Sequence, residues 1–522
     1  MAMWMHWYGY EDMSIKIRVL EYGLRCTDMA MGMQAWVCGC GYEYVVMKTR
    51  KCGGGSGYCY TEMQKPIKFY AVALKEYPFP CIYAKKCVTL RRIWQKEEMT
   101  NKHKIINDPV FGFLHIPNDL LYDILQHPLV QRLIRIRQLG LSYLVYPGAM
   151  HSRFSHSLGA MHLMSEGIAS LRQKGVEISD SEATGALAAI LLHDVGHGPF
   201  SHVLEHTLVE GITHEDISLL MMEHINQELA DKDAQLSLGD TPSSGQSAIR
   251  SKRPLDEAIA IFKDEYPRHF LHQLISSQLD VDRMDYLCRD SFFTGVQEGR
   301  IASERLLKML NVKDDRLVIE VKGIYSVEKF LVARRLMYWQ VYLHKTSVAA
   351  EQHLIKILTR AKALAQRGCE LFCSPALHYF LYNHVTVENF SLEQYALLDD
   401  TDVLSAIKVW MSSDDKVLSL LSRAFVNRQL FRGRLLDTPL TAAEKDELRV
   451  HYAKAFGLSK EEADYFFAEH ISTSNTYSEK DDSIDILYQD GTVRDIATAS
   501  EILDLTTLTH KPQKLYVFQF RG

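Results

Sequence analysis

The chain of 522 residues lacks the long apolar run of a membrane-spanning helix, since no stretch approaches the roughly 18–20 apolar residues that cross a bilayer. Its first residues also lack the basic start and unbroken apolar stretch of a secretory signal. Excess positive charge is absent too: the formal net charge is -6, which provides no global field to attract nucleic acid. These absences predict a cytoplasmic protein without a membrane partner, and they disfavour nucleic acid as a partner.

Cysteine patterns of the secreted or zinc-binding kind are also lacking. Of the ten cysteines, seven precede residue 100, but Cys38 and Cys40 with the two that follow do not form paired C-x2-C knuckles. The glycine run at 53–55 lacks the G-K-[ST] ending of a phosphate loop. We therefore expect residues 1–98 to be a reduced N-terminal extension of unknown role. It is either a disordered accessory segment or a non-native product of an over-extended reading frame.

A well-patterned globular sequence begins near Met99. Hydrophobic residues make up 47% of the chain, enough for at least one sizeable core. Apolar residues at helical spacing predict a mainly α-helical domain over 99–365, followed by a smaller mixed α+β region over 366–522. The polar stretch at about 230–254, rich in Ser, Asp and Pro, is expected to be a flexible surface loop.

Several elements can be placed more closely. An apolar stretch predicts a buried helix over 182–193, which the following glycines and proline stop. Hydrophobic periodicity predicts further helices over 217–229, 256–262, 269–287, 303–310 and 326–364, a short strand pair over 317–325 and a strand over 514–520.

The densest group of chemically active side chains is the string His-Asp-Val-Gly-His-Gly-Pro-Phe-Ser-His at 193–202. His193 and Asp194 end the predicted buried helix, where successive residues diverge by about 100° and can hold one ion from two sides. An imidazole beside a carboxylate suits Mn, Fe, Zn or a similar divalent ion. Polar groups behind a buried helix cost stability unless they are paired, so the string predicts a metal site. Other metal-capable segments lie at 151–156, 213–215 and 280–286.

The string resembles the signature of the HD superfamily of metal-dependent phosphohydrolases, which is named for this His-Asp doublet. The resemblance is strongest to the dNTP triphosphohydrolase branch, over 103–350, and it is absent before residue 99. It implies an all-α HD core and the hydrolysis of a deoxynucleoside triphosphate to deoxynucleoside and triphosphate. The further segments that carry it are Gln138–Gly140, Tyr146–Ala149, His151–Gly159, Asp280–Tyr286, Arg289–Asp290, and Arg334 with Tyr342–Lys345.

Position by position, the resemblance implies a set of site residues around one divalent ion, which is Mn, Fe, Zn, Co or Mg. Two imidazoles and two carboxylates would leave room for water and a phosphate oxygen. The implied metal ligands are His156, His193, Asp194 and Asp282. The implied catalytic residues are His197, His202 as the acid to the leaving 5′-oxygen, His214, and Glu205 in place of an orienting aspartate. The implied substrate contacts are Gln138, Leu139, Arg153, Tyr286, Asp290, Arg334, Tyr342 and Lys345.

The resemblance also implies a homo-oligomer, a dimer or tetramer, with a regulatory nucleotide site at the subunit contact. The positions that keep this regulatory pattern are Lys104, Asn107, Gln131 and Arg428. Two positions depart from it: Gln126 replaces an aspartate that reads guanine, and Ile134 replaces an arginine that grips phosphate. A nucleotide activator is therefore retained as an expectation, but not guanine-specific activation through the same contacts.

Other interpretations stay open at this point. The nearest is another HD chemistry, a nucleotide monophosphatase or phosphodiesterase, which would release different products. A second is a nucleotide-sensing module that binds without turnover, although a sensor has no need of a proton donor. A nuclease is disfavoured by the net charge. The metal, the preferred base and the oligomer size are not determined by the residues alone.

Overall fold

The computed structural model describes residues 32–37, 43–48, 104–200, 203, 207–209, 211–238, 253–473, 483–500 and 512–521. The chain divides into two compact units, Met1–Thr100 and Asn101–Gly522. In the first unit, β1 (Gly32–Val37) and β2 (Glu43–Lys48) pair as an antiparallel hairpin. The rest of the predicted N-terminal extension lies outside the described residues.

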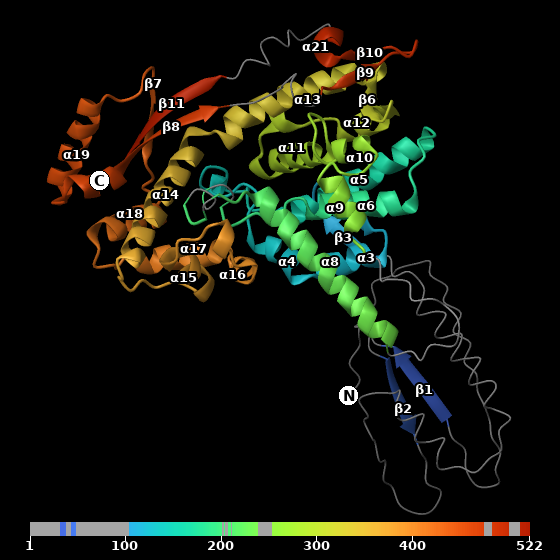
Figure 1. Cartoon of the computed structure of the whole chain (residues 1–522), viewed down its shortest axis with the longest axis horizontal. Coiled ribbons are helices and arrows are strands. Elements are labelled where there is room, and N and C mark those ends of the chain that lie inside the picture. Colours follow the sequence, from blue (N-terminus) through green and yellow to red (C-terminus); the bar gives the residue numbers. More distant parts are fainter. Residues whose placement is uncertain are drawn as a thin grey trace, which may run out of the picture. The chain divides into compact units, whose positions relative to one another are not determined.

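The second unit is mainly helical, as the sequence predicts. Its centre contains α5 (Arg153–Gln173), α6 (Asp180–Leu192), α9 (Asp256–Phe262) and α11 (Val281–Thr294); α5 packs on α6 and α11, and α6 packs on α9 (Figure 1). Helix α6 begins with a capping box and is buried on all sides over its last two turns, so it occupies the middle of the core.

The other helices surround this centre or build the C-terminal region. Within the described residues, no helix combines the length and apolar character needed to cross a bilayer. Those on the N-terminal side are α3 (Asp119–Gln126), α4 (Pro128–Gln131), α8 (His214–Leu238), α10 (His269–Gln273), α12 (Ser303–Met309), α13 (Ile324–Met337) and α14 (Lys345–Gln366). The C-terminal ones are α15 (Pro375–Tyr382), α16 (Leu392–Leu397), α17 (Asp400–Trp410), α18 (Lys416–Val426), α19 (Ala442–Phe456), α20 (Lys460–Ala463) and α21 (Ile496–Ala499).

Three small sheets complete the unit, and two of them give the C-terminal region its expected mixed character. The first is the hairpin of β3 (Lys104–Asp108) and β4 (Gly112–Ile116). The second has the order β10-β9-β6-β5, with β10 (Val493–Asp495), β9 (Asp485–Leu487), β6 (Arg316–Glu320) and β5 (Leu310–Lys313). The third has the order β7-β11-β8, with β7 (Arg432–Leu436), β11 (Gln513–Gln519) and β8 (Phe467–Thr473).

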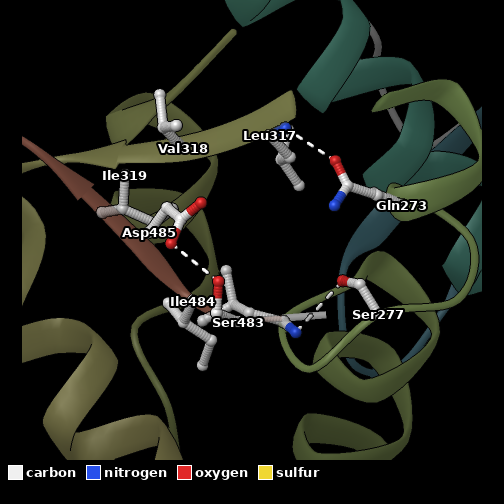
Figure 2. A pocket seen from close by; sticks show the side chains of 9 residues that line it. Gln273, Ser277, Leu317, Val318, Ile319, Ser483, Ile484 and Asp485 are labelled. Atoms are coloured by element: carbon white, nitrogen blue, oxygen red, sulfur yellow. Dashed lines mark hydrogen bonds between the residues drawn. The ribbon is translucent and has the colours of Figure 1, made fainter. Parts of the chain in front are cut away.

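The parallel pairing of β6 with β9 ties the C-terminal region to the helical core. Figure 2 shows this junction: the backbone N–H of Leu317 donates to Gln273 of α10 at 2.7 Å, and Ser483 bonds to Asp485 at 2.7 Å. The cavity between them measures about 20 Å³. It has room for little more than a single water molecule, so it is a packing void and no ligand site.

Two predicted elements are displaced or divided. The strand pair predicted over 317–325 lies earlier, at β5 and β6, because Asp314 and Asp315 adopt positive φ (51° and 58°) and form the tight turn between the strands. The single helix predicted over 326–364 is divided into α13 and α14 by a π-helical turn, Tyr338–Tyr342. Such turns are frequent at functional sites.

The helix predicted over 269–287 is also divided. Helix α10 ends at Gln273, and α11 begins only after Asp280, whose carboxylate accepts a hydrogen bond from the backbone N–H of Arg283 at 2.7 Å. Aspartate is a favoured residue at the start of a helix, because its carboxylate accepts a hydrogen bond from an otherwise unpaired N–H group of the first turn. The cap therefore overrides the continuous apolar pattern.

The prediction of a surface loop over 230–254 is wrong for its first residues. Helix α8 contains the predicted helix 217–229 and continues to Leu238. The alanines, leucines, lysine and glutamine of 230–238 are good helix formers, which explains the extension despite the polar composition. The remainder of the predicted loop, 239–252, lies outside the described residues.

The packing of α5 against α11 depends on Gly159. A Cβ atom there would lie 1.9 Å from Oδ1 of Asp285 and 2.2 Å from Nη2 of Arg289. Both charged side chains are fully buried and form an ion pair, with Nε and Oδ2 2.9 Å apart. The two helices can therefore enclose this pair only because residue 159 has no side chain.

We expect Gly159→Ala to lower the free energy of unfolding by about 3–5 kcal/mol, because the added methyl group must disrupt a buried ion pair. Thermal or urea denaturation measures the loss. Gly167→Ala is the matched control on the same helix: its Cβ would meet nothing closer than 3.5 Å, and alanine favours helix. Equal stabilities of the two variants would contradict the expectation.

Candidate metal centre

Three side chains from three different helices converge at the centre of the second unit. His156 comes from the first turn of α5, His193 directly follows α6, and Asp282 lies in the first turn of α11. Nε2 of His156 lies 3.3 Å from Nε2 of His193 and 3.0 Å from Oδ1 of Asp282. Nε2 of His193 lies 3.4 Å from the same oxygen. These atoms form a cluster that could hold one metal ion.

The donor atoms fit a divalent cation. Ligand atoms about 2.1 Å from one ion, at tetrahedral or octahedral angles, lie about 3.0–3.4 Å from one another. The two imidazoles are also oriented correctly. Nδ1 of His156 bonds to Oδ2 of Asp285 at 2.7 Å, and Nδ1 of His193 donates to the carbonyl of Ile190 at 2.6 Å. Both Nε2 atoms therefore turn their lone pairs to the same point.

Asp194, the fourth predicted ligand, adjoins this cluster. Its Oδ1 lies 3.5 Å from Nε2 of His193, and its Oδ2 lies 3.7 Å from Nε2 of His156. The same carboxylate is held from the other side by the guanidinium of Arg153 and by Nδ1 of His197 at 3.2 Å. Asp194 thus links the cluster to two of the residues predicted to contact phosphate or to act in catalysis.

The electrostatics of the cluster are those of a cation site. Burial lowers the pKa of His156, but hydrogen bonds and charges from Asp282 and Asp285 outweigh it and raise that pKa to about 10. Burial alone would raise the pKa of Asp282, whereas His156 and His193 hold it far below its usual range. The pKa of Asp194 is also lowered, against the effect of burial, by His197, His193 and Arg153. The carboxylates therefore demand positive charge at this point.

A chain of buried charges stands behind His156. Asp285 accepts from both His156 and Arg289, and Nη1 of Arg289 lies 2.7 Å from Oδ2 of Asp108 at the end of β3. Arg289 and Asp285 are fully buried. A carboxylate that orients a metal-ligating imidazole is a frequent support of metal sites. The sequence prediction gave these residues no role, although Asp285 follows Asp282 by three positions and so shares its helix face.

Two glycines shape the loop that follows the cluster. A Cβ on Gly196 would lie 2.2 Å from the backbone nitrogen of Ser218, and one on Gly198 would lie 2.7 Å from the hydroxyl of Tyr395. The loop is thereby seated against α8 and α16. This brings the rings of His197 and His214 to a centroid distance of 4.0 Å. The other predicted catalytic residues, His202 and Glu205, lie outside the described residues.

A cavity of about 420 Å³ opens from the cluster. His193, Asp194 and Asp282 form its inner wall, and His214 lies in its lining. Its volume is within the usual range for small-molecule sites. The rest of the lining mixes apolar and charged groups: Glu215, Asp216, Leu219, Phe262, Lys263, His272, Ile275, Ser276 and Arg283.

The predicted substrate contacts do not line this cavity, and several of them gather elsewhere. Asp290 is buried and accepts from Nε2 of His151 and from the hydroxyl of Tyr342, each at 2.8 Å. The ring of Tyr286 meets that of Tyr342 edge to face, with 6.0 Å between the centroids. These residues form a second cluster, with Asp290 and Tyr286 on α11, Tyr342 on the π-helical turn and His151 just before α5.

The remaining predicted contacts have different surroundings. Arg334 of α13 is buried and donates from Nη1 to Gln278 at 3.2 Å, while its Nε has no hydrogen-bond partner among the described residues. Oε1 of Gln138 is buried and equally without a partner in the described structure. Leu139 is half-buried, and Lys345, the first residue of α14, is exposed.

The predicted regulatory residues are dispersed over the β3–β4 hairpin and two helix ends. Lys104 and Asn107 are exposed on β3, and the ammonium group of Lys104 lies over the ring of Tyr122. Gln131 ends α4, and Arg428 follows α18, where it donates to the carbonyl of Leu144. Among the described residues, no hydrogen bond or ion pair joins these four to one another.

The helical core with this histidine and aspartate cluster matches a known family. The model of the HD domain matches residues 153–290, and that of the HD associated region matches residues 301–367. The chain belongs to the HD-domain phosphohydrolases. This class of enzyme implies a divalent metal, with which the cluster of His156, His193 and Asp282 is consistent.

Individual relatives support this family assignment. A solved structure of a phosphohydrolase from Bacteroides thetaiotaomicron is 54% identical, has a TM-score of 0.74, and covers 80% of this chain and 100% of its own. The uncharacterized protein YwfO of Bacillus subtilis is 38% identical over 64% of this chain and 72% of its own length. The human deoxynucleoside triphosphate triphosphohydrolase SAMHD1 is 30% identical, over 46% of this chain and 42% of its own length.

Asp285→Asn should weaken metal binding by roughly 10- to 100-fold, because it removes the charge that orients and supports the imidazole of His156. Competition with a chromogenic chelator measures the affinity. Asp415→Asn is the matched control, since that carboxylate also pairs with a buried arginine, Arg360, but caps α18 away from the cluster. An unchanged affinity in Asp285→Asn would remove this aspartate from the site.

Metal affinity should rise with pH. The pKa of His156 is raised to about 10 in the metal-free protein, so at neutral pH an incoming ion must displace its proton. We expect the dissociation constant to fall by about tenfold for each unit of pH between about 6 and 8. Calorimetric titration in two buffers of different protonation enthalpy counts the released protons; fewer than one per ion would contradict this assignment.

Proposed function

We propose that this phosphohydrolase acts on deoxynucleoside triphosphates, which it hydrolyses to a deoxynucleoside and triphosphate. The observation that carries the proposal is the convergence of His156, His193 and Asp282 on one point beside Asp194, at the wall of a cavity of about 420 Å³. A metal held there would neutralise phosphate charge and lower the pKa of water. Water adds to the α-phosphorus and gives up a proton, the bond between the α-phosphorus and the 5′-oxygen breaks, and the 5′-oxygen takes up a proton.

The residues around the cluster suit the phosphate end of such a substrate. Burial and the neighbouring charge of Arg153 lower the pKa of His197 to about 3, so its ring is neutral at physiological pH. A neutral imidazole can donate a hydrogen bond to a phosphate oxygen but is a poor source of protons there. This supports a binding role for His197, with His214 beside it. The proton for the 5′-oxygen is then assigned to His202.

The second cluster suits the sugar end. In this proposal Gln138, Asp290 and Tyr342 hold the deoxyribose, because a buried amide oxygen without a partner and a buried carboxylate are acceptors that a sugar hydroxyl can satisfy. His151 orients Asp290 from behind. Leu139 and Tyr286 close the sugar edge, and the cationic residues Arg153, Arg334 and Lys345 contact the phosphate chain.

The human relative is named as a deoxynucleoside triphosphate triphosphohydrolase, which supports this substrate class, although the similarity spans less than half of either chain. We extend the proposal to a homo-oligomer, a dimer or tetramer, with a nucleotide activator bound at the contact between subunits. Lys104, Asn107, Gln131 and Arg428 would hold it. Gln126 and Ile134, both exposed, argue against recognition of guanine by the family's contacts.

The test is chromatography of the products from each of four dNTPs with Mn, Fe, Co, Zn or Mg. We expect free triphosphate and deoxynucleoside in equal amounts. His193→Ala and Asp282→Asn should each lower the rate by about 1,000-fold or more, whereas Asp415→Asn should retain it. Release of orthophosphate or pyrophosphate would indicate another HD nucleotide phosphatase or phosphodiesterase. Metal-dependent dNTP binding without any product would indicate a sensing module.

A further inference from the structure

The loop that carries His197 has few internal hydrogen bonds and is held from outside. This segment, Asp194–Phe200, which we call the HD loop, follows the end of α6. Its residues are all buried, and the carbonyl groups of a buried segment need hydrogen-bond partners. Phe200 at its end has a φ of 54°, a backbone conformation that residues other than glycine rarely adopt. Such a loop keeps one conformation only if its surroundings impose it.

Arg132 supplies two of the external bonds and a third bond to the C-terminal region. Its side chain is fully buried, and its guanidinium donates to the carbonyls of Val195 at 3.1 Å, His197 at 2.7 Å and Leu398 at 3.3 Å. Arginine has five donors in a rigid fork and no acceptor. It can therefore join two turns of the HD loop to a third backbone segment, which a lysine cannot do with the same geometry.

That third segment, Tyr395–Asp400, belongs to the C-terminal region at the junction of α16 and α17. The ring of Tyr395 lies under the guanidinium of Arg132, 4.9 Å from ring centroid to Cζ, and its hydroxyl donates to the carbonyl of Gly196 at 2.9 Å. The carboxylate of Asp400 accepts from the backbone N–H of Phe200 at 3.1 Å. It contacts the loop at the residue with positive φ.

The Tyr395–Asp400 segment also bonds to Arg135 and Arg137, which precede α5. The second oxygen of Asp400 accepts from the backbone and side chain of Arg137, at 3.1 and 3.3 Å, and Asp399 pairs with Arg135. Tyr395 and Asp400 are both buried, with 2% and 3% of their surface exposed. Arg132, Tyr395 and Asp400, which we call the clasp, thus hold the HD loop from two sides and are shielded from water.

We propose that Arg132, Tyr395 and Asp400 are positioning residues that hold the HD loop, and with it His197, in the conformation that hydrolysis requires. This inference rests on the proposed function for the role of His197. It extends the catalytic unit past Gln366, into a segment that neither family match includes. None of the three residues is a metal ligand or a lining residue of the cavity.

Tyr395→Phe tests the proposal with the smallest change, the loss of one hydroxyl. Amide hydrogen exchange over 195–200 should become roughly tenfold faster, since one buried bond that holds the loop is lost. With whichever substrate the enzyme turns over, kcat should fall roughly 3- to 10-fold while KM and metal affinity stay within about twofold. Arg132→Lys should lower kcat further, by roughly 100-fold.

Tyr452→Phe is the matched control. Tyr452 is also buried, at 5% exposure, and its hydroxyl donates to the carbonyl of Phe520 at 3.1 Å, in the C-terminal region away from the loop. It should match Tyr395→Phe in its loss of thermal stability but leave loop exchange and kcat at the wild-type values. Equal exchange over 195–200 in the two variants overturns the proposal, whether or not Arg132→Lys folds.

The proposed dNTP hydrolysis and the positioning role of these residues are tested by different measurements. If the wild-type protein releases no triphosphate from any dNTP, the proposed function is wrong, but hydrogen exchange in Tyr395→Phe still decides whether the clasp holds the loop. If triphosphate is released and Tyr395→Phe keeps wild-type kcat and exchange, the proposed function stands and the positioning role is rejected.

Discussion

The structure depends on the balance of buried charge around His156. This imidazole lies at the meeting point of α5, α6 and α11, with carboxylates on both of its nitrogen atoms. Unpaired charge in such a place is costly, so each carboxylate requires a cation and each cation a carboxylate. The sequence of pairs runs from Asp282 through His156, Asp285 and Arg289 to Asp108. A proton or a metal ion would complete it at the open end, so we expect metal binding, pH and folding to be coupled in this protein.

The small residues of the motif follow from the same crowding. Gly159 makes room for the ion pair of Asp285 and Arg289, Gly196 for the backbone of α8, and Gly198 for the hydroxyl of Tyr395. In each case the limiting atom is charged, polar or backbone, so it cannot be moved aside as easily as a flexible apolar side chain. The glycines are therefore needed because helices must approach closely enough to bring His156, His193 and Asp282 onto one point.

Local patterns predicted the parts of this site that lie within single elements. The apolar run before His193 predicts a buried helix that holds the His193-Asp194 doublet rigidly. The family resemblance supplied the other ligands, His156 on α5 and Asp282 on α11. What local patterns could not show is which distant groups satisfy the buried ones. The cap at Asp280 and the π-helical turn before α14 break apolar runs that read as continuous helices. Nothing near Arg132 in the chain indicates that its guanidinium would meet carbonyls some 65 and 266 positions away.

This difference bears on where the catalytic unit ends. A boundary near residue 365 follows the change in sequence pattern, and the match to the HD associated region also ends at residue 367. Hydrogen bonds cross that boundary, because the hydroxyl of Tyr395 and the carboxylate of Asp400 bond to backbone groups of the HD loop, as Arg132 does from the N-terminal side. Similarity detects side chains that touch substrate or metal, whereas a carbonyl can be satisfied by many sequences. The Tyr395–Asp400 segment is thus part of the site through the backbone bonds that hold the HD loop, although it contributes no atom to the chemistry.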